Sequence, residues 1–304
     1  MSKIMIYGCY GYSGALIARE AVKRGLKPIL AGRRETSVHA IADELQCASQ
    51  VFPLDDTDVI AANIQDIDVI IHAAGPFSST AEPMMRACVL AKTHYVDITG
   101  EMDVFELAKG LDQQFKRAGI VVIPGVGFDI IPTDCVAAKL KELMPDANRL
   151  SLGFDSRSGM SVGTAKTSIE GMGYGGKVRH DGEIIAVPHA YKTRRIDFGD
   201  NEKLATTIPW GDVATAYYST NIPNIEVYIP AAPKMLKGMK ILNHFSWMLR
   251  WTWLQNFLKG KVNKKIQAPS DEKRARTPTY VWGCLLYTSP SPRDATLSRM
   301  PSSA

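Results

Sequence analysis

In the first 123 residues, short apolar runs alternate with segments whose apolar residues recur at helical spacing. The pattern predicts strands at 3–7, 27–31, 49–54, 68–72, 95–96 and 120–123, and helices at 13–24, 35–45, 80–91 and 103–117. Strands this apolar are typical of a parallel sheet that helices cover on both faces. Because crossovers between parallel strands are right-handed, the expected fold is α/β, a Rossmann-type doubly wound parallel sheet.

The turn after the first strand contains Gly8, Gly11 and Gly14. In a dinucleotide-binding turn, such glycines permit the tight bend, the close approach of a pyrophosphate and the packing of the helix on the sheet. Tyr12 and Ser13 belong to the same predicted cofactor-binding turn, where a helix N-terminus offers N–H groups to phosphates. The alternative is a tight turn without a ligand, but the alternating elements behind it favour a nucleotide.

The residues after the second strand indicate which dinucleotide to expect. NAD-binding proteins usually have Asp or Glu about 20 residues past the glycines, for the ribose 2′-hydroxyl. Here Gly32 is followed by Arg33 and Arg34, while Glu35 is expected to open the next helix, where an acid suits the helix dipole. Two guanidinium groups suit a 2′-phosphate, so we predict NADP, against the alternative of two solvated surface arginines.

The fourth strand is followed by small residues and then by a Gly-Pro pair that ends the extended run. Ala74, Gly75 and Pro76 follow it at the carboxyl edge of the sheet, where such folds bind ligands, and they are predicted to line the cofactor. His72, the last residue of the strand, is either a proton donor or a packed core residue, and packing is the favoured interpretation.

Polar residues in the next two loops are candidates for catalysis. Asp97 and Glu101 follow the fifth strand and can lie near a nicotinamide or a substrate. The alternative is that Thr99 or Gly100 caps the next helix and Glu101 lies in its first turn. Asp129 lies between Phe128 and Ile130, where an unpartnered acid is costly to bury, so it is either paired with an arginine or part of the site.

Two further expectations concern helix starts in the second half of the chain. Thr133 or Asp134 is a natural N-cap, with Pro132 preventing an earlier start. Lys166 is predicted in the first turn of a helix that opens near Gly163, against the helix dipole. Lys166 is therefore a catalytic candidate that can contact a substrate or a carboxylate, with a solvated surface lysine as the alternative.

Composition narrows the functional class. The chain has 304 residues, which suggests two domains, and a net charge of +5, which fits a phosphorylated ligand without requiring nucleic acid. The five cysteines are scattered with no C-x-x-C pair, so we expect reduced thiols, no metal site and a cytoplasmic location. Partners are then expected to be a small-molecule or lipid-like substrate.

Residues 235–265 contain apolar residues at helical spacing, three closely placed tryptophans and lysines at both ends. Basic amphipathic helices lie on membranes or cover hydrophobic substrates, so peripheral membrane contact is one interpretation. Packing within the domain, or in a homodimer, is the other.

The last residues lose both strand and helix periodicity. Residues 284–304 look like the translation of a DNA sequencing adapter, which leads to the hypothesis that they are not native and that the natural protein continues differently after Gly283. The expected domains are then 1–130 for NADP binding, 131–283 for substrate or dimerisation, with this domain truncated, and 284–304 as a non-native tail.

Five segments together resemble a known family. "GCYGYSG", "LAGRR", "AGPF", "HYVDITGE" and "GVGFDIIPTD" occur in the order found in saccharopine dehydrogenase-like proteins, and most closely in the NADP-binding-domain branch that includes trans-acting enoyl reductases. The resemblance covers about residues 3–283 and implies a Rossmann domain followed by a mixed α/β domain. The family usually has Ala-Thr or Ala-Asn where this chain has Cys9 and Tyr10, which puts a larger ring beside the predicted pyrophosphate site.

The expected function is that of an NADP-dependent oxidoreductase acting on a C=N, C=O or activated C=C bond of a small or lipid-like molecule. The alternative is a non-catalytic NADP-binding protein that acts as a sensor or at lipid surfaces.

Overall fold

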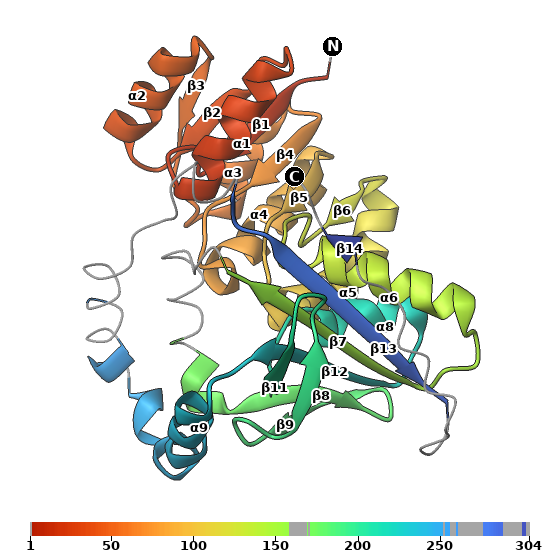
Figure 1. Cartoon of the computed structure of the whole chain (residues 1–304). Helices are drawn as coiled ribbons and strands as arrows, with labels where there is room; N and C mark the ends of the chain where they lie inside the picture. Colours follow the sequence, from red (N-terminus) through yellow and green to blue (C-terminus); the bar gives the residue numbers. More distant parts are fainter. Residues whose placement is uncertain are drawn as a thin grey trace. The chain divides into compact units, whose positions relative to one another are not determined.

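The computed structural model describes residues 2–157, 169, 171–251, 253–255, 260, 276–287 and 300–301. It divides into two compact units, Met1–Asp129 and Ile130–Ala304, which are considered separately below (Figure 1).

The first unit contains a six-stranded sheet in the order β3-β2-β1-β4-β5-β6, with every neighbouring pair parallel. Its strands are β1 (Ile4–Tyr7), β2 (Ile29–Gly32), β3 (Ser49–Val51), β4 (Val69–His72), β5 (His94–Asp97) and β6 (Val122–Ile123). This is the strand order of dinucleotide-binding folds, and it places the reversal of direction between β1 and β4. The predicted doubly wound sheet is confirmed.

Five helices connect these strands: α1 (Tyr12–Lys23), α2 (Glu35–Leu45), α3 (Thr57–Ile64), α4 (Phe77–Ala91) and α5 (Met102–Ala118). The sequence pattern predicted four of them and missed α3. A clear start signal was present, because Asp56 caps α3 by accepting hydrogen bonds from the N–H groups of Asp58 and Val59 at 2.8 and 3.3 Å.

The sheet is buried on both faces because side chains alternate along each strand. Ile6 of β1 packs in one cluster with Ala18 of α1 and Val38 of α2. Its neighbours Met5 and Tyr7 lie in the other cluster, with residues of α3, α4 and α5. The Tyr7 hydroxyl, although buried, donates to the carbonyl of Phe52 at 2.7 Å. Both layers therefore hold β1 in register, which fixes the position of the glycine turn that follows it.

The second unit contains a mixed sheet in the order β10-β11-β12-β7-β13-β14, with the hairpin of β8 and β9 joined to β12. Its strands are β7 (Arg149–Ser156), β8 (Gly176–His180), β9 (Glu183–Val187), β10 (Thr193–Asp197), β11 (Glu202–Ile208), β12 (Asn224–Pro230), β13 (Thr279–Leu286) and β14 (Met300–Pro301). Among the strands that the structure describes in this unit, only β7 and β12 pair in parallel. The predicted second, mixed α/β domain is confirmed.

The helical elements with described bounds in this unit are α6 (Ile131–Leu143), α8 (Asp212–Thr220) and α9 (Pro233–Phe245), with short 3₁₀ turns η1 (Met172–Tyr174) and η2 (Met248–Arg250). None of the helices in the described ranges is long and apolar enough to cross a membrane.

The expected start of α6 was wrong. The helix begins at Ile131, so Pro132 lies inside its first turn, where its missing N–H is not needed. The Thr133 hydroxyl instead donates to the carbonyl of Ile130 at 3.0 Å, and Asp134 accepts from Ser219 at 2.7 Å. Neither side chain caps the helix, because each has a partner elsewhere.

Strand β13 continues past Gly283 into the segment assigned to a non-native tail. Gly283 faces α6, where a Cβ would come within 2.6 Å of both Leu140 and Val136. Cys284 and Leu285 are buried, and they pair with Ser151 and Leu150 of β7. The boundaries at 130 and 283 and the origin of residues 284–304 stay predictions.

Candidate functional site

The glycine turn after β1 is built so tightly that side chains are excluded. Gly8 has φ of +84°, and a Cβ there would come within 2.8 Å of the backbone of Ala73. A Cβ on Gly14 would lie 2.2 Å from the Gly8 carbonyl oxygen, and one on Gly11 would lie 3.2 Å from the same atom. The turn therefore needs glycine at Gly8 and Gly14, the former for its conformation as well as its space.

The start of α1 has the features of an anion site. Gly11 is the N-cap residue, no side chain caps the helix, and no acid lies in its first turn. Tyr12 is exposed and Ser13 is half-buried at this end. Helix N-termini of this kind present N–H groups and a positive dipole end to phosphate.

The basic pair lies beside this turn, directly after β2. Arg33 and Arg34 are exposed, and the Arg34 guanidinium carbon lies 4.5 Å from the centre of the Tyr10 ring. Tyr10 also contacts the end of β2, since a Cβ on Gly32 would meet its Cε1 atom at 2.6 Å. The tyrosine that replaces the usual small residue thus positions one of the two arginines by a cation–π contact.

Asp97, at the end of β5, connects two loops at the carboxyl edge of the sheet. Its Oδ1 accepts from the N–H groups of Thr99 and Gly125 at 2.9 and 2.8 Å, and its Oδ2 accepts from the Tyr95 hydroxyl at 2.6 Å. Burial raises the pKa of Asp97 despite these three donors, which each lower it. Because Asp97 is fully buried and bonded to the loops, its geometry is that of a positioning residue.

Sequence reasoning missed Tyr95 and Gly125 as the partners of Asp97. Tyr95 could have been found, because residues two apart on a strand point to the same face. Gly125 could not, because it lies on the next loop and only the pairing of β5 with β6 brings it close.

Glu101 does not lie in the first turn of α5, and Gly100 is not the N-cap residue of that helix. It is the N-cap residue of α5, and its N–H donates to the Thr99 hydroxyl oxygen at 3.1 Å. Its carboxylate reaches the start of α4, where it accepts from the N–H groups of Phe77 and Ser78 at 3.0 and 2.7 Å. The alternative that placed Glu101 in the first turn of α5 is therefore wrong, because its carboxylate caps α4, which follows a different strand. Its catalytic role stays a prediction.

Asp129 packs against the same loop. A Cβ on Gly100 would come within 3.1 Å of Asp129 Oδ2, so the glycine makes room for this carboxyl group. Burial raises the pKa of Asp129 to about 6. Asp97, Glu101 and Asp129 are thus gathered around the β5–α5 loop. A pKa of about 6 suits Asp129 to exchanging protons near neutral pH. Lys166, the fourth candidate, lies outside the described residues.

The loop after β4 is held by Thr80, which sequence reasoning did not single out. The Thr80 hydroxyl donates to the Ala74 carbonyl at 2.7 Å and lies 3.0 Å from the Pro76 carbonyl. The peptide bond between Gly75 and Pro76 is cis. Ala74, Gly75 and Pro76 therefore form an ordered loop next to the glycine turn, because Ala74 also lies against Gly8.

His72 is a packed residue. It is fully buried among Tyr7, Phe77 and Tyr95, and burial lowers its pKa to about 3. Its Nε2 lies 3.1 Å from the Thr80 hydroxyl oxygen, whose hydrogen is used elsewhere, so we infer that Nε2 is the protonated nitrogen. A ring that stays neutral at physiological pH is a poor proton donor, which agrees with the favoured interpretation.

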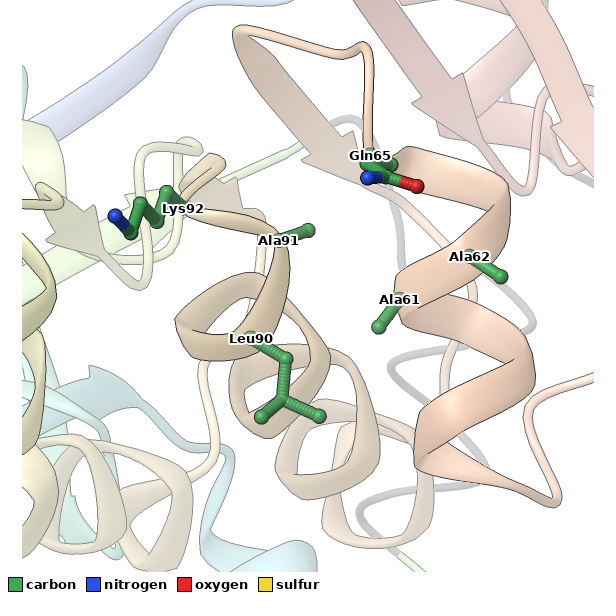
Figure 2. Close-up of a pocket in the computed structure, with 6 residues that line it drawn as sticks. All are labelled: Ala61, Ala62, Gln65, Leu90, Ala91 and Lys92. Atoms are coloured by element: carbon green, nitrogen blue, oxygen red, sulfur yellow. The ribbon is translucent and has the colours of Figure 1, made fainter.

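Two other features were considered as sites. In the part of the chain that the structure describes, no three His, Cys, Asp or Glu side chains are grouped to hold a metal ion. Figure 2 shows a hollow between α3 and α4, lined by Ala61, Ala62, Gln65, Leu90, Ala91 and Lys92. These residues come just before β4 and β5, at the opposite edge of the sheet from the glycine turn, and offer few polar groups.

Comparisons with known proteins agree with this geometry. Residues 4–123 match the family model described as saccharopine dehydrogenase NADP binding domain. A trans-acting enoyl reductase of Mycobacterium ulcerans (strain Agy99) is 30% identical over 142 residues, which are 43% of this chain and 34% of that protein. A lipid droplet localized protein of Caenorhabditis elegans is 27% identical over 153 residues, 46% of this chain and 36% of that protein. The matches thus span about a third of these relatives.

A solved structure extends the likeness beyond the first unit. Apo saccharopine dehydrogenase (L-Glu forming) from Saccharomyces cerevisiae superposes with a TM-score of 0.60 over 90% of this chain and 70% of that chain, at 14% identity. At this identity the match concerns the fold alone. The expected family resemblance is confirmed for residues 4–123, which match the model of the saccharopine dehydrogenase NADP binding domain.

Proposed function

We propose that this chain is an NADP-dependent oxidoreductase whose substrate carries a C=N, C=O or activated C=C bond. The observation that supports it most is the pairing of a turn that has no room for a side chain at Gly8 or Gly14 with two exposed arginines directly after β2. The matched family is described as NADP-binding, in agreement with the arginines. Several relatives are named enoyl reductases, which makes an enoyl group, in a small or lipid-like molecule, the first substrate class to test.

The residues present fit NADP. Gly11 at the N-cap carries no side chain, and neither a capping side chain nor an acid occupies the first turn of α1, so its N–H groups can serve a pyrophosphate. Arg33 and Arg34 supply charged donors for the 2′-phosphate, where no acidic side chain follows β2 directly. Tyr10 holds Arg34 by its ring, and Ala74 to Pro76 provide a small-residue wall at the neighbouring edge.

The bound cofactor would supply hydride chemistry, which requires from the protein mainly orientation and a proton. Asp97 fixes the loops after β5 and β6, and Glu101 fixes the start of α4. Asp129, protonated below a pKa of about 6, holds the proton at its carboxyl group beside Gly100. We assign it as the proton donor in the reducing direction, with Lys166 as a further candidate. A cytoplasmic location and a homodimer stay predictions.

The test separates cofactor choice from catalysis. NADPH and NADH affinities are measured for the double variant Arg33→Ala and Arg34→Ala, with Arg24→Ala as a control that removes an exposed arginine from the far end of α1. Loss of two charge-assisted contacts should weaken NADPH binding roughly 10²- to 10³-fold, with NADH nearly unchanged. Equal losses for both nucleotides would show that the arginines do not read the 2′-phosphate.

Turnover is then assayed on a panel of imines, ketones and enoyl thioesters. Oxidation of NADPH in the presence of any of these substrates would support the proposed oxidoreductase activity. Tight NADPH binding without turnover across the panel would instead favour a non-catalytic NADP-binding sensor.

A further inference from the structure

Helix α9 belongs to the second unit (Figure 1). It has one packed face and one exposed face. On the packed face, Leu236 is buried against Ala190 and Ala231. Asn243 secures the same face, because its side chain accepts from the His189 N–H at 2.7 Å and donates to the His189 carbonyl at 3.1 Å. The orientation of α9 on its own unit is therefore fixed by specific contacts.

The opposite face carries large apolar side chains into solvent. Lys234, Lys237, Ile241 and Phe245 recur at helical spacing and are all exposed, with Ile241 at 60% and Phe245 at 51%. Side chains of this size that the fold leaves in water usually mark a surface of contact with something else.

Three exposed tryptophans follow the helix in the chain. Trp247, Trp251 and Trp253 are 56%, 42% and 64% exposed. The ring centres of Trp247 and Trp251 are 5.3 Å apart, and those of Trp251 and Trp253 are 6.1 Å apart, so the rings form one cluster. Ile241, Phe245 and these three residues are called the tryptophan surface below.

In the sequence, the charged residues before and after these positions have one sign. No Asp or Glu occurs in the sequence between Glu226 and Asp271. The same stretch contains eight basic residues: Lys234, Lys237, Lys240, Arg250, Lys259, Lys261, Lys264 and Lys265. Lys234, Lys237 and Lys240 are exposed on α9 beside the apolar residues.

We propose that the tryptophan surface and the lysines of α9 attach this protein to an anionic phospholipid surface. Tryptophan is enriched at membrane interfaces because its ring is apolar while its N–H can stay hydrated. Lysines are attracted to anionic headgroups. Basic amphipathic segments of this kind lie in the interface plane, so the proposed attachment is peripheral.

The charge pattern favours lipid over a second copy of this chain. A two-fold symmetric contact through the tryptophan surface would bring the lysines of one copy close to those of the other. In the segment from 227 to 270 there is no acid to compensate this repulsion. An anionic bilayer compensates it directly. This proposal is independent of the proposed oxidoreductase activity, because its residues all belong to the second unit.

The experiment is flotation of the full chain with vesicles of pure phosphatidylcholine, or of phosphatidylcholine with 30% phosphatidylserine. We expect binding to the anionic vesicles that weakens as salt is raised, because the charges are screened. The triple variant Lys234→Gln, Lys237→Gln, Lys240→Gln should lose about fivefold in partitioning per lysine, or roughly 100-fold in total. The matched control is Lys27→Gln, Lys92→Gln, Lys109→Gln, three exposed lysines of the first unit, and it should bind like the parent chain.

A second triple variant, Trp247→Ser, Trp251→Ser, Trp253→Ser, should lose binding to the anionic vesicles. Its NADPH affinity and unfolding temperature should match the parent, which distinguishes loss of lipid contact from misfolding and from failure of the cofactor proposal. Equal binding to neutral and anionic vesicles would overturn the proposal. The proposal would also be overturned if the parent chain bound neither kind of vesicle and formed a dimer that the tryptophan replacements dissociate into monomers.

Discussion

Replacing Glu101 tests whether its carboxylate holds the structure or acts in catalysis. In the structure it accepts hydrogen bonds from Phe77 at 3.0 Å and Ser78 at 2.7 Å, the first amides of α4. Hydrogen bonds to a charged acceptor contribute about 1.5–3 kcal/mol each to stability. The bond from Ser78 is exposed to solvent, so its contribution is at the lower end. Removing both, together with the favourable charge at the helix N-terminus, should cost about 2–3 kcal/mol.

This free energy converts into a measurable shift. Unfolding entropy is about 2.1 cal/mol/K per residue, so for the unit that ends at Asp129 each kcal/mol lowers the unfolding temperature by about 4 °C. Glu101→Ala should then unfold about 7–11 °C below the parent chain, and Glu101→Gln, which keeps one acceptor oxygen, by about half as much. The control Glu44→Ala removes an exposed pair with Arg19 and should shift the midpoint by about 2 °C.

Thermal unfolding of the first unit is followed by circular dichroism with NADPH turnover measured in parallel. A Glu101→Ala variant that melts within 2 °C of the parent yet loses turnover would refute the capping role and return Glu101 to catalysis.

Three further predictions follow from the same structure. Asp129→Asn should stabilise the chain at pH 8 by up to about 3 kcal/mol and have little effect near pH 4. The reason is that a pKa raised to about 6 makes the ionised carboxylate costly to fold above pH 6, whereas near pH 4 the group is largely protonated when folded. Denaturant titrations at both pH values check this, and turnover of the parent chain in the reducing direction should fall as pH rises through 6. Gly14→Ala should abolish NADPH binding, since its Cβ would lie 2.2 Å from the Gly8 carbonyl oxygen, and calorimetry showing parental affinity would contradict the described turn. Gly32→Ala should lower NADPH affinity about tenfold by displacing the Tyr10 ring, and a double-mutant cycle with Tyr10→Ala should show a much smaller effect of Gly32→Ala once the ring is gone.

Local sequence patterns predicted most elements of the first unit. The helix from Glu35 to Leu45 begins and ends as predicted, because an acid suits its first turn and its apolar residues follow the helical period. Helix α3 was missed because it is short and apolar nearly all round, so its period carries little information even though Asp56 marks its start. Such errors arise where a local pattern fits more than one structure.

The glycine turn was determined by the sequence itself. Gly11 and Gly14 both lie against the Gly8 carbonyl oxygen, so their spacing after an apolar strand already contains this local part of the geometry. The crowding at Gly8 itself comes from Ala73 and Ala74, which the pairing of β1 with β4 brings close. The position of Arg33 and Arg34 followed for the same reason, because the residue after β2 is adjacent to that turn in any sheet with this strand order.

The roles of the acidic residues were decided only by the tertiary structure. Glu101 meets amides that lie 24 and 23 residues earlier in the chain, and Asp97 meets Gly125, 28 residues later. Contacts between residues so far apart in the chain leave no local sequence pattern. The sequence alone could therefore offer Asp97 and Glu101 as catalytic candidates, but it could not distinguish a positioning carboxylate from a reactive one. The difference arises because hydrogen-bond partners and burial set what a carboxyl group does, and both come from strands and loops brought together by folding.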